Sequence, residues 1–191
     1  MRFDGEIRIN NVRTKIFIFR DLFSEKEMEL IRDGIDTHHC VEERYDYSGN
    51  VLADSCGLRH FDNINEIENI TMNAFNFIRD NMSKYLFVNT VIDKSYFHFR
   101  RIFGTTKKHI DGVVTHGVGS TPTIRVLSII AGLNNDFKGG ELLFPDFNNL
   151  KVKVGAGDAI VFPPYWTHVH GTTDLIDGTS RYTINTWFEH G

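Results

Sequence analysis

The second half of the chain consists of short β-prone runs separated by turns, and this pattern constrains the fold more than any other. Seven such runs follow one another, with Gly, Asn and Pro between them and no helical periodicity. They are Ser95–Phe103, Thr123–Ala131, Glu141–Phe144, Leu150–Val154, Asp158–Phe162, Thr167–Gly171 and Arg181–Phe188. Strands at this spacing predict a double-sheet jelly roll, a double-stranded β-helix, rather than a parallel α/β sheet.

The first half of the chain carries two helical signals. Ser24 followed by Glu27 is a capping-box pattern, which predicts that a helix begins here. Three apolar residues then share one helical face: Met28, Ile31 and Ile35. A second stretch, Glu66–Lys84, keeps apolar residues at helical spacing. We expect these helices to pack against one sheet of the jelly roll from outside.

No helix or strand period is sustained over Val41–Asn65, whereas Ile16–Phe19 is apolar and β-prone. A long loop is often a lid or a binding loop, so Val41–Asn65 is a candidate for substrate contact. At 191 residues, without a Pro-, Ser- or Gly-rich linker, the chain fits a single domain. We expect residues 1–94 to supply supporting helices and a loop, and residues 95–191 to form a jelly-roll catalytic core. The predicted class is mainly β with flanking helices.

Charge and composition narrow the partners and the compartment. The formal net charge of -4 lacks the basic excess of a nucleic-acid-binding domain, so it favours a small or peptide-like substrate over nucleic acid. Cys40 and Cys56 are too few for a disulfide scaffold and show no metal-type pairing, which predicts two reduced thiols. The N-terminus has no apolar signal core, and no apolar run approaches about 20 residues. We therefore expect a cytoplasmic protein without a membrane segment; the pattern specifies no oligomeric state.

The residues that carry chemistry begin with His109 and Asp111. They are two positions apart, so on an extended segment an imidazole nitrogen and a carboxylate oxygen point to the same side. A further imidazole would complete three ligands, and His168 or His170 could supply it, while His116 lies in a Gly-rich stretch. A two-His, one-carboxylate set leaves positions open on the metal, as in non-heme Fe(II) oxygenases. The pattern therefore predicts a metal site with room for further ligands.

Arg181 opens the last predicted strand. Strand alternation places Arg181, Asn185 and Trp187 on one face. If that face looks into the barrel, a guanidinium is held inside, where a charge is costly unless it is paired. Because the planar fork of Arg meets a carboxylate with two parallel hydrogen bonds, a dicarboxylate ligand would supply the partner.

With these residues placed, the chain from Ser95 to Phe188 resembles the 2-oxoglutarate- and Fe(II)-dependent dioxygenases, in their prolyl 4-hydroxylase-like branch. The motif pieces occur in the family order: Phe103-Gly104, His109-Ile110-Asp111, Arg125-Val126-Leu127-Ser128, Leu133-Asn134, Gly139-Gly140-Glu141, Val154-Gly155-Ala156-Gly157-Asp158, and Arg181-Tyr182 with Trp187. In the family a Gly lies eight residues beyond the distal His, and a basic residue about ten beyond it. His170 fits this spacing, with Gly178 at plus eight and Arg181 at plus eleven. The resemblance thus selects His170 over His168.

The resemblance also implies cofactors and roles. Fe(II) would bind three ligands: His109, Asp111 and His170. The cosubstrates would be 2-oxoglutarate and O2, with ascorbate as a further reductant. Arg181 would grip the distal carboxylate of 2-oxoglutarate, and Asn185 and Trp187 would line the same pocket. Two positions that often hold a Tyr touching 2-oxoglutarate in relatives are Arg101 and Gly132 here, which predicts a pocket lined differently.

The implied reaction is hydroxylation of an unactivated C–H bond with release of succinate and CO2, on a peptidyl proline if the branch is a guide to the substrate. Asp111 favours hydroxylation, because related halogenases have Ala or Gly in its place. Three alternatives remain: the same chemistry on a small molecule or a nucleobase, a catalytically silent jelly-roll binding module, and a zinc-binding structural domain. Nucleic-acid demethylases usually carry a second Arg where this chain has Trp187. The complete ligand set argues against a silent module, and neither Cys lies near the histidines to close a zinc site.

Overall fold

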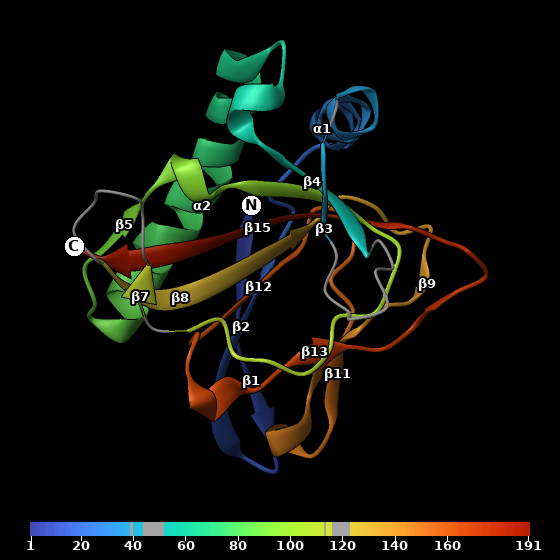
Figure 1. Ribbon diagram of the computed structural model, residues 1–191. Helices are drawn as coiled ribbons and strands as arrows, with labels where there is room; N and C mark the ends of the chain where they lie inside the picture. Colours follow the sequence, from blue (N-terminus) through green and yellow to red (C-terminus); the bar gives the residue numbers. More distant parts are fainter. Residues whose placement is uncertain (39, 44–51, 113, 116–122) are drawn as a thin grey trace.

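The computed structural model describes residues 1–38, 40–43, 52–112, 114–115 and 123–191 (Figure 1). Ten antiparallel strands form the larger sheet, which we call the major sheet. Eight of them follow the order β1 (Arg2–Ile9), β2 (Val12–Arg20), β12 (Ala159–Phe162), β8 (Thr123–Gly132), β15 (Arg181–His190), β6 (His98–Ile102), β4 (Ala53–Gly57) and β3 (Val41–Glu43). The other two are β5 (Thr90–Ile92), which pairs with β15, and β7 (Val114–Thr115), which pairs with β8. The minor sheet has the order β11 (Leu150–Val152), β10 (Leu142–Phe144), β13 (Gly171–Thr172), and β9 (Lys138–Gly139) pairs with β14 (Leu175–Ile176). The helices are α1 (Glu25–Thr37), α2 (Ile64–Leu86) and short 3-10 turns at Leu58–His60, Lys94–Tyr96, Pro145–Phe147 and Trp166–His168. The mainly β class with flanking helices is confirmed.

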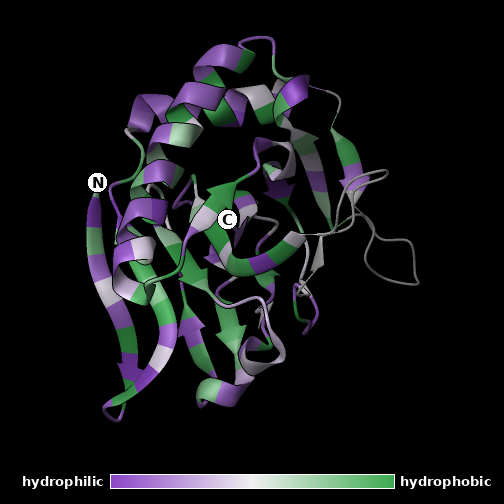
Figure 2. Cartoon of the chain, turned by 90° about the vertical axis from the view of Figure 1, so that its left-hand side faces the viewer, coloured by the Kyte–Doolittle hydropathy of each residue, from purple (hydrophilic) through white to green (hydrophobic). Residues whose placement is uncertain are grey.

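Both predicted helices are present, and they cover one face of the major sheet. The capping box forms: the Ser24 backbone N–H donates to the Glu27 carboxylate at 2.7 Å, and the Glu27 N–H donates to Ser24 Oγ at 3.4 Å. The predicted apolar face of α1 is buried at Met28, Ile31 and Ile35. Hydrophilic residues lie on the outer sides of the helices, as Figure 2 shows. None of the helices in the described part of the chain combines the length and the apolar character needed to cross a bilayer.

Residues 1–94 contribute more than the helices and loop that the sequence predicts. β1 and β2 form a hairpin whose turn residues Asn10 and Asn11 have φ of 49° and 67°, as a two-residue type I′ turn requires. β2 then pairs with β12, with Phe19 opposite Ala159, so the hairpin belongs to the major sheet. β1 carries no apolar period because it is a partly exposed edge strand. Because of the charged residues in β1, the sequence pattern does not predict this strand.

The stretch Val41–Asn65 is not simply a loop. It contains β3 and β4, and β4 joins the major sheet by pairing with β6, with Ser55 opposite Arg100. The centre of the stretch, residues 44–51, lies outside the described residues. A role as a substrate lid therefore stays a prediction.

The prediction of two reduced thiols is wrong. Cys40 and Cys56 form a disulfide, with Cα atoms 4.7 Å apart, and Cys56 is fully buried. The bond joins the segment after α1 to β4. The two cysteines meet because β3 and β4 pair, with Val41 opposite Ser55. The number of cysteines alone does not predict this disulfide.

The central strands of the major sheet are buried on both faces. Between the sheet and the helices lies the larger apolar cluster, which includes Phe17, Phe19, Phe75, Ile129, Ile184 and Phe188. Between the major and minor sheets lies a smaller one: Ile16, Ile130, Leu142, Phe144, Val154, Ile160 and Phe162. The smaller cluster fills only part of the space between the two sheets, so the rest of this space can hold polar and charged side chains.

Candidate active site

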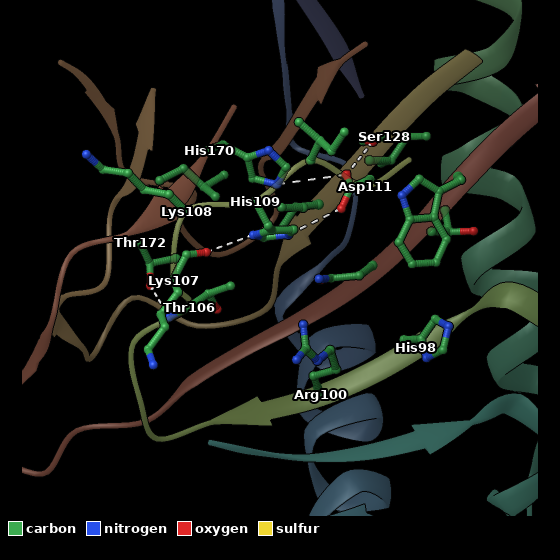
Figure 3. A pocket seen from close by; sticks show the side chains of 18 of the residues that line it. His98, Arg100, Thr106, Lys107, Lys108, His109, Asp111, Ser128, His170 and Thr172 are labelled. Atoms are coloured by element: carbon green, nitrogen blue, oxygen red, sulfur yellow. Dashed lines mark hydrogen bonds and ion pairs between the residues drawn. The ribbon is translucent and has the colours of Figure 1, made fainter. Parts of the chain in front are cut away.

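A cavity of about 430 Å³ lies between the two sheets. Its walls come from β6, β8 and β15 of the major sheet and from β10 and β13 of the minor sheet, together with the segment that follows β6. It is lined by the six residues to which the resemblance assigns a role: His109, Asp111, His170, Arg181, Asn185 and Trp187. Figure 3 shows the two histidines and the aspartate directed toward one another.

Two of the three metal-ligand candidates are held together by their own backbones. His109 and His170 form an isolated antiparallel bridge, in which the N–H of His109 donates to the His170 carbonyl at 2.8 Å and the return bond measures 3.0 Å. Asp111 faces both rings: its Oδ1 lies 3.4 Å from His109 Nε2, and its Oδ2 lies 3.8 Å from His170 Nε2. One atom from each residue lies within 4.8 Å of the others. The predicted strand Thr167–Gly171 is in fact a 3-10 turn followed by this bridge and β13.

The histidine tautomers suit a metal at this point. His109 Nδ1 lies 2.9 Å from the Lys107 carbonyl oxygen, and His170 Nδ1 lies 3.0 Å from the His168 carbonyl oxygen. Because a carbonyl oxygen only accepts, each Nδ1 carries the proton, and in the neutral rings the lone pair lies on Nε2, which faces Asp111. Ligating histidines usually donate their second nitrogen to a backbone carbonyl in this way. The donor set therefore fits Fe(II).

Asp111 is held at both its side chain and its backbone by β8. Ser128 Oγ donates to Asp111 Oδ2 at 2.5 Å, and Arg125 Nη1 donates to the Asp111 carbonyl at 2.8 Å. The Arg125 guanidinium in turn stacks 3.8 Å above the ring of Trp187. Burial by itself raises the pKa of Asp111, but hydrogen bonding to the protonated form of His109, the charge of His170 and the hydrogen bond from Ser128 outweigh it and lower the pKa to about 2. The carboxylate is thus ionised and oriented.

His168 has a structural environment instead. Its Nε2 lies 2.8 Å from the Thr14 carbonyl oxygen and its Nδ1 lies 2.9 Å from Thr167 Oγ1, so both ring nitrogens are engaged. The side chain is 4% exposed and ties the 3-10 turn to β2. Neither nitrogen is left for a metal, which agrees with the selection of His170. His116 lies outside the described residues.

Arg181 supplies a buried cation that has no carboxylate partner among the described residues. It is 3% exposed, its Nη1 donates to the Gly140 carbonyl at 2.7 Å, and its Nε has no hydrogen-bond partner in the described part of the chain. Burial, followed by the charge of Arg100, lowers its pKa to about 10. Asn185 Oδ1 in the same wall is also without a partner among these residues. Such orphaned polar atoms indicate a missing polar ligand, and beside a guanidinium that ligand is an anion.

Arg101 and Gly132, which stand where relatives often hold a Tyr, do not line the cavity. Arg101 points to the helix side, where Nη1 lies 3.3 Å from Asp36 Oδ1. Gly132 has no room for a side chain, because an added Cβ would lie 2.3 Å from the Gly155 carbonyl oxygen. Two cavity residues on β6 were missed by sequence reasoning, His98 and Arg100. Arg100 lies opposite Thr183 and therefore on the face of Arg181. The signal that could have found it is alternation along β6.

The fold places three candidate metal ligands and a buried arginine in one cavity between two sheets. Residues 97–189 match the family described as the 2OG-Fe(II) oxygenase superfamily. This match confirms the resemblance to 2-oxoglutarate- and Fe(II)-dependent dioxygenases that the motifs indicated, and the family implies Fe(II), 2-oxoglutarate and O2. Among curated proteins, none matches the sequence significantly.

Solved structures of prolyl hydroxylases share the fold. A prolyl hydroxylase from Trichoplax adhaerens, in complex with a peptide of the hypoxia inducible factor oxygen degradation domain, has a TM-score of 0.72 at 13% identity, over 93% of this chain and 84% of that one. A prolyl-4-hydroxylase from Pseudomonas putida has a TM-score of 0.60 at 15% identity, over 93% and 94%. The viral collagen prolyl hydroxylase of Paramecium Bursaria Chlorella virus-1, solved with 2-oxoglutarate, has 0.59 at 14%, over 93% and 96%.

Proposed function

We propose that this chain is a single oxygenase domain that hydroxylates an unactivated C–H bond of a peptidyl proline, with 2-oxoglutarate and O2 as cosubstrates. The metal ligands would be His109, Asp111 and His170. Fe(II) would supply the oxidative chemistry that side chains cannot perform, including the use of O2, with ascorbate as a reductant that keeps the metal ferrous. The same chemistry on a small molecule is the alternative.

The protein's own part is binding and orientation. Ser128 and Arg125 hold Asp111 so that its carboxylate faces the two Nε2 atoms. Arg181 would bind the distal carboxylate of 2-oxoglutarate with its guanidinium, and Asn185 and Trp187 would complete that wall. The apolar residues beside the site, Ile130 and Leu142, limit access of water to the bound cosubstrate.

The observation that carries the proposal is a buried arginine and a three-ligand metal set in one cavity. A guanidinium that is 3% exposed and lacks a carboxylate partner in the described residues destabilises the fold unless a ligand compensates it. A binding module without turnover would have no use for both features. A peptide substrate is supported by the Trichoplax adhaerens structure, which holds a peptide on a similar fold.

The first test is turnover of 2-oxoglutarate. Purified protein with Fe(II) should convert 2-oxoglutarate slowly to succinate even without a prime substrate, and His170→Ala should abolish this. His168→Ala is the matched control and should retain succinate formation wherever the protein is folded. Equal loss in two folded variants would contradict the choice of distal ligand.

The second test addresses the substrate. Proline-containing peptides incubated with the protein, Fe(II) and 2-oxoglutarate should gain one oxygen in mass spectrometry, located on a prolyl residue by fragmentation. Succinate formation without any oxidised peptide would leave the oxygenase chemistry standing and contradict the prolyl substrate.

A further inference from the structure

Basic residues gather on one side of the cavity mouth. Arg100, Lys107 and Lys108 all line the cavity, and we call these three residues the basic rim. Lys107 and Lys108 are exposed and directly precede His109, while Arg100 is half-buried on β6. Figure 3 shows Arg100 directed from β6 toward His109. The rim therefore adjoins the metal-ligand segment itself.

The basic rim is unusual in a chain whose formal net charge is -4. Among the described residues that line the cavity, Asp111 is the single carboxylate, against Arg181 and the three cations of the rim. A ferrous ion with one carboxylate ligand carries one positive charge, 2-oxoglutarate carries two negative charges, and Arg181 carries one positive charge. The filled interior would therefore be neutral, and the exposed charges of Lys107 and Lys108 would face the molecule that binds next.

The backbone of the rim is fixed relative to the metal ligands. The Lys107 carbonyl accepts from His109 Nδ1 at 2.9 Å. Thr106 is held to β13 by two hydrogen bonds. Its N–H donates to Thr172 Oγ1 at 2.9 Å, and its carbonyl accepts from the Thr172 N–H at 3.0 Å. A group bound by the rim would thus be held at a set position from the reacting centre, with little ordering cost to the protein.

We propose that the prime substrate is an acidic peptide, with Asp or Glu side chains next to the residue that is hydroxylated. This inference rests on the proposed function and names the substrate of the same site. Because Lys107 and Lys108 are exposed at the mouth, their partner is a group that stays outside while the reacting side chain enters. An extended substrate meets this condition, and carboxylates complement the rim in charge.

A second groove on the molecule has the opposite sign. It lies beside α1, and its charged lining residues are Glu25, Arg32, Asp33, Asp36 and Asp136. Four carboxylates against one guanidinium repel an acidic peptide from this side. The two grooves together would orient such a peptide toward the cavity that holds the metal ligands.

The test is peptide binding to the protein loaded with Fe(II) and 2-oxoglutarate under anaerobic conditions, measured by fluorescence anisotropy. Two labelled peptides of equal length share a central proline, and differ only in having Asp and Glu or Asn and Gln around it. With several exposed ion pairs at stake, the acidic peptide should bind roughly 10-fold more tightly at low salt. The difference should shrink below about 3-fold near 1 M salt, where the Debye length is about 3 Å.

The variant Lys107→Gln with Lys108→Gln should remove most of the preference. Its matched control is Lys26→Gln with Lys84→Gln, which changes the net charge equally on the exposed sides of α1 and α2 and should leave the preference intact. Equal binding of the two peptides, or an equal loss in both double variants, would overturn the inference. Succinate formation in the absence of an acidic preference would reject this inference alone, whereas acidic-peptide binding without any 2-oxoglutarate turnover would reject only the proposed function.

Discussion

Arg181 and Tyr182 are neighbours on β15, yet they face opposite sides of the major sheet. Arg181 is buried in the cavity, where its pKa is lowered to about 10. Tyr182 faces α1, where burial, followed by its hydrogen bond to Asp36, raises its pKa to about 12. Burial favours the neutral form in both cases. The Tyr182 hydroxyl donates to the Asp36 carboxylate, whereas Arg181 donates to the Gly140 carbonyl and has no carboxylate partner among the described residues. At these two positions the helix-side hydroxyl has an acidic partner within the protein, and the cavity-side guanidinium can receive an anionic ligand.

The two faces therefore divide stability from function. Toward the helices the strands present Ile129, Ile184 and Phe188, all nearly or fully buried in apolar contact. Toward the minor sheet the same strands present Ser128, Asn185 and Arg181. If this division holds, substitutions on the helix side change the free energy of unfolding, and substitutions on the cavity side change ligand binding.

The largest effect is expected for Phe188→Ala on the helix side. Phe188 is fully buried and its ring lies 6.4 Å from that of Phe75. Its truncation should lower the free energy of unfolding by about 3–5 kcal/mol, because it removes buried apolar area and leaves a cavity. Urea denaturation measures this, and Phe87→Ala, at a residue 93% exposed, is the control with almost no expected change. Comparable losses in the two variants would refute the assignment of stability to this face.

Most of this helix-side architecture could be predicted from the sequence, because apolar periodicity reports burial directly. The capping box at Ser24, the apolar faces of both helices and the strand that carries Ile184 all follow from local pattern. β1 could not be predicted in this way, because an edge strand needs no apolar face. The Cys40–Cys56 disulfide could not be predicted either, because it depends on how β3 and β4 pair. Long-range pairing leaves no local mark.

The cavity side was predictable for a different reason. His109 and Asp111 are a chemically recognisable pair, and the resemblance to the family implies a spacing to Arg181 that selects His170 over His168. Arg100 was not predicted to line the cavity, because deciding whether Arg100 or Arg101 faces the cavity requires the register of β6 against β15. A shift of one residue exchanges the cavity face for the helix face, so an uncertain register reverses the assignment.

The next prediction turns on that register. Arg181→Leu should raise the apparent KM for 2-oxoglutarate by roughly 30-fold or more, because a desolvated charge pair is lost. Arg101→Leu, on the neighbouring strand but directed to Asp36, should leave this KM unchanged. The rate of succinate formation against 2-oxoglutarate concentration measures both. A raised KM in the Arg101 variant, or an unchanged one in the Arg181 variant, would place the anchor elsewhere.

A smaller effect is expected for Ser128→Ala. Without the hydroxyl that donates at 2.5 Å to Asp111 Oδ2, the carboxylate loses its orientation. Affinity for Fe(II), measured by competition with a chelator, should fall roughly 10-fold, as for other outer hydrogen-bond partners of metal ligands. Ser83→Ala on α2 is the control and should bind Fe(II) as the wild type does. An unchanged affinity in Ser128→Ala would mean that Arg125 alone positions Asp111.

The smallest effect is the pH dependence of Tyr182 on the helix side. Its folded pKa of about 12 lies above the ordinary value of 10.0, so folding favours the protonated phenol. The contribution to stability is therefore complete below pH 10 and is lost as the pH rises toward 12. In a phenolate absorbance titration of the folded protein, the difference between the wild type and Tyr182→Phe should show a transition near pH 12. A transition near the ordinary pKa of tyrosine would show that the hydroxyl does not donate to Asp36. It would also contradict the contrast between Tyr182 and Arg181 on the two faces of β15.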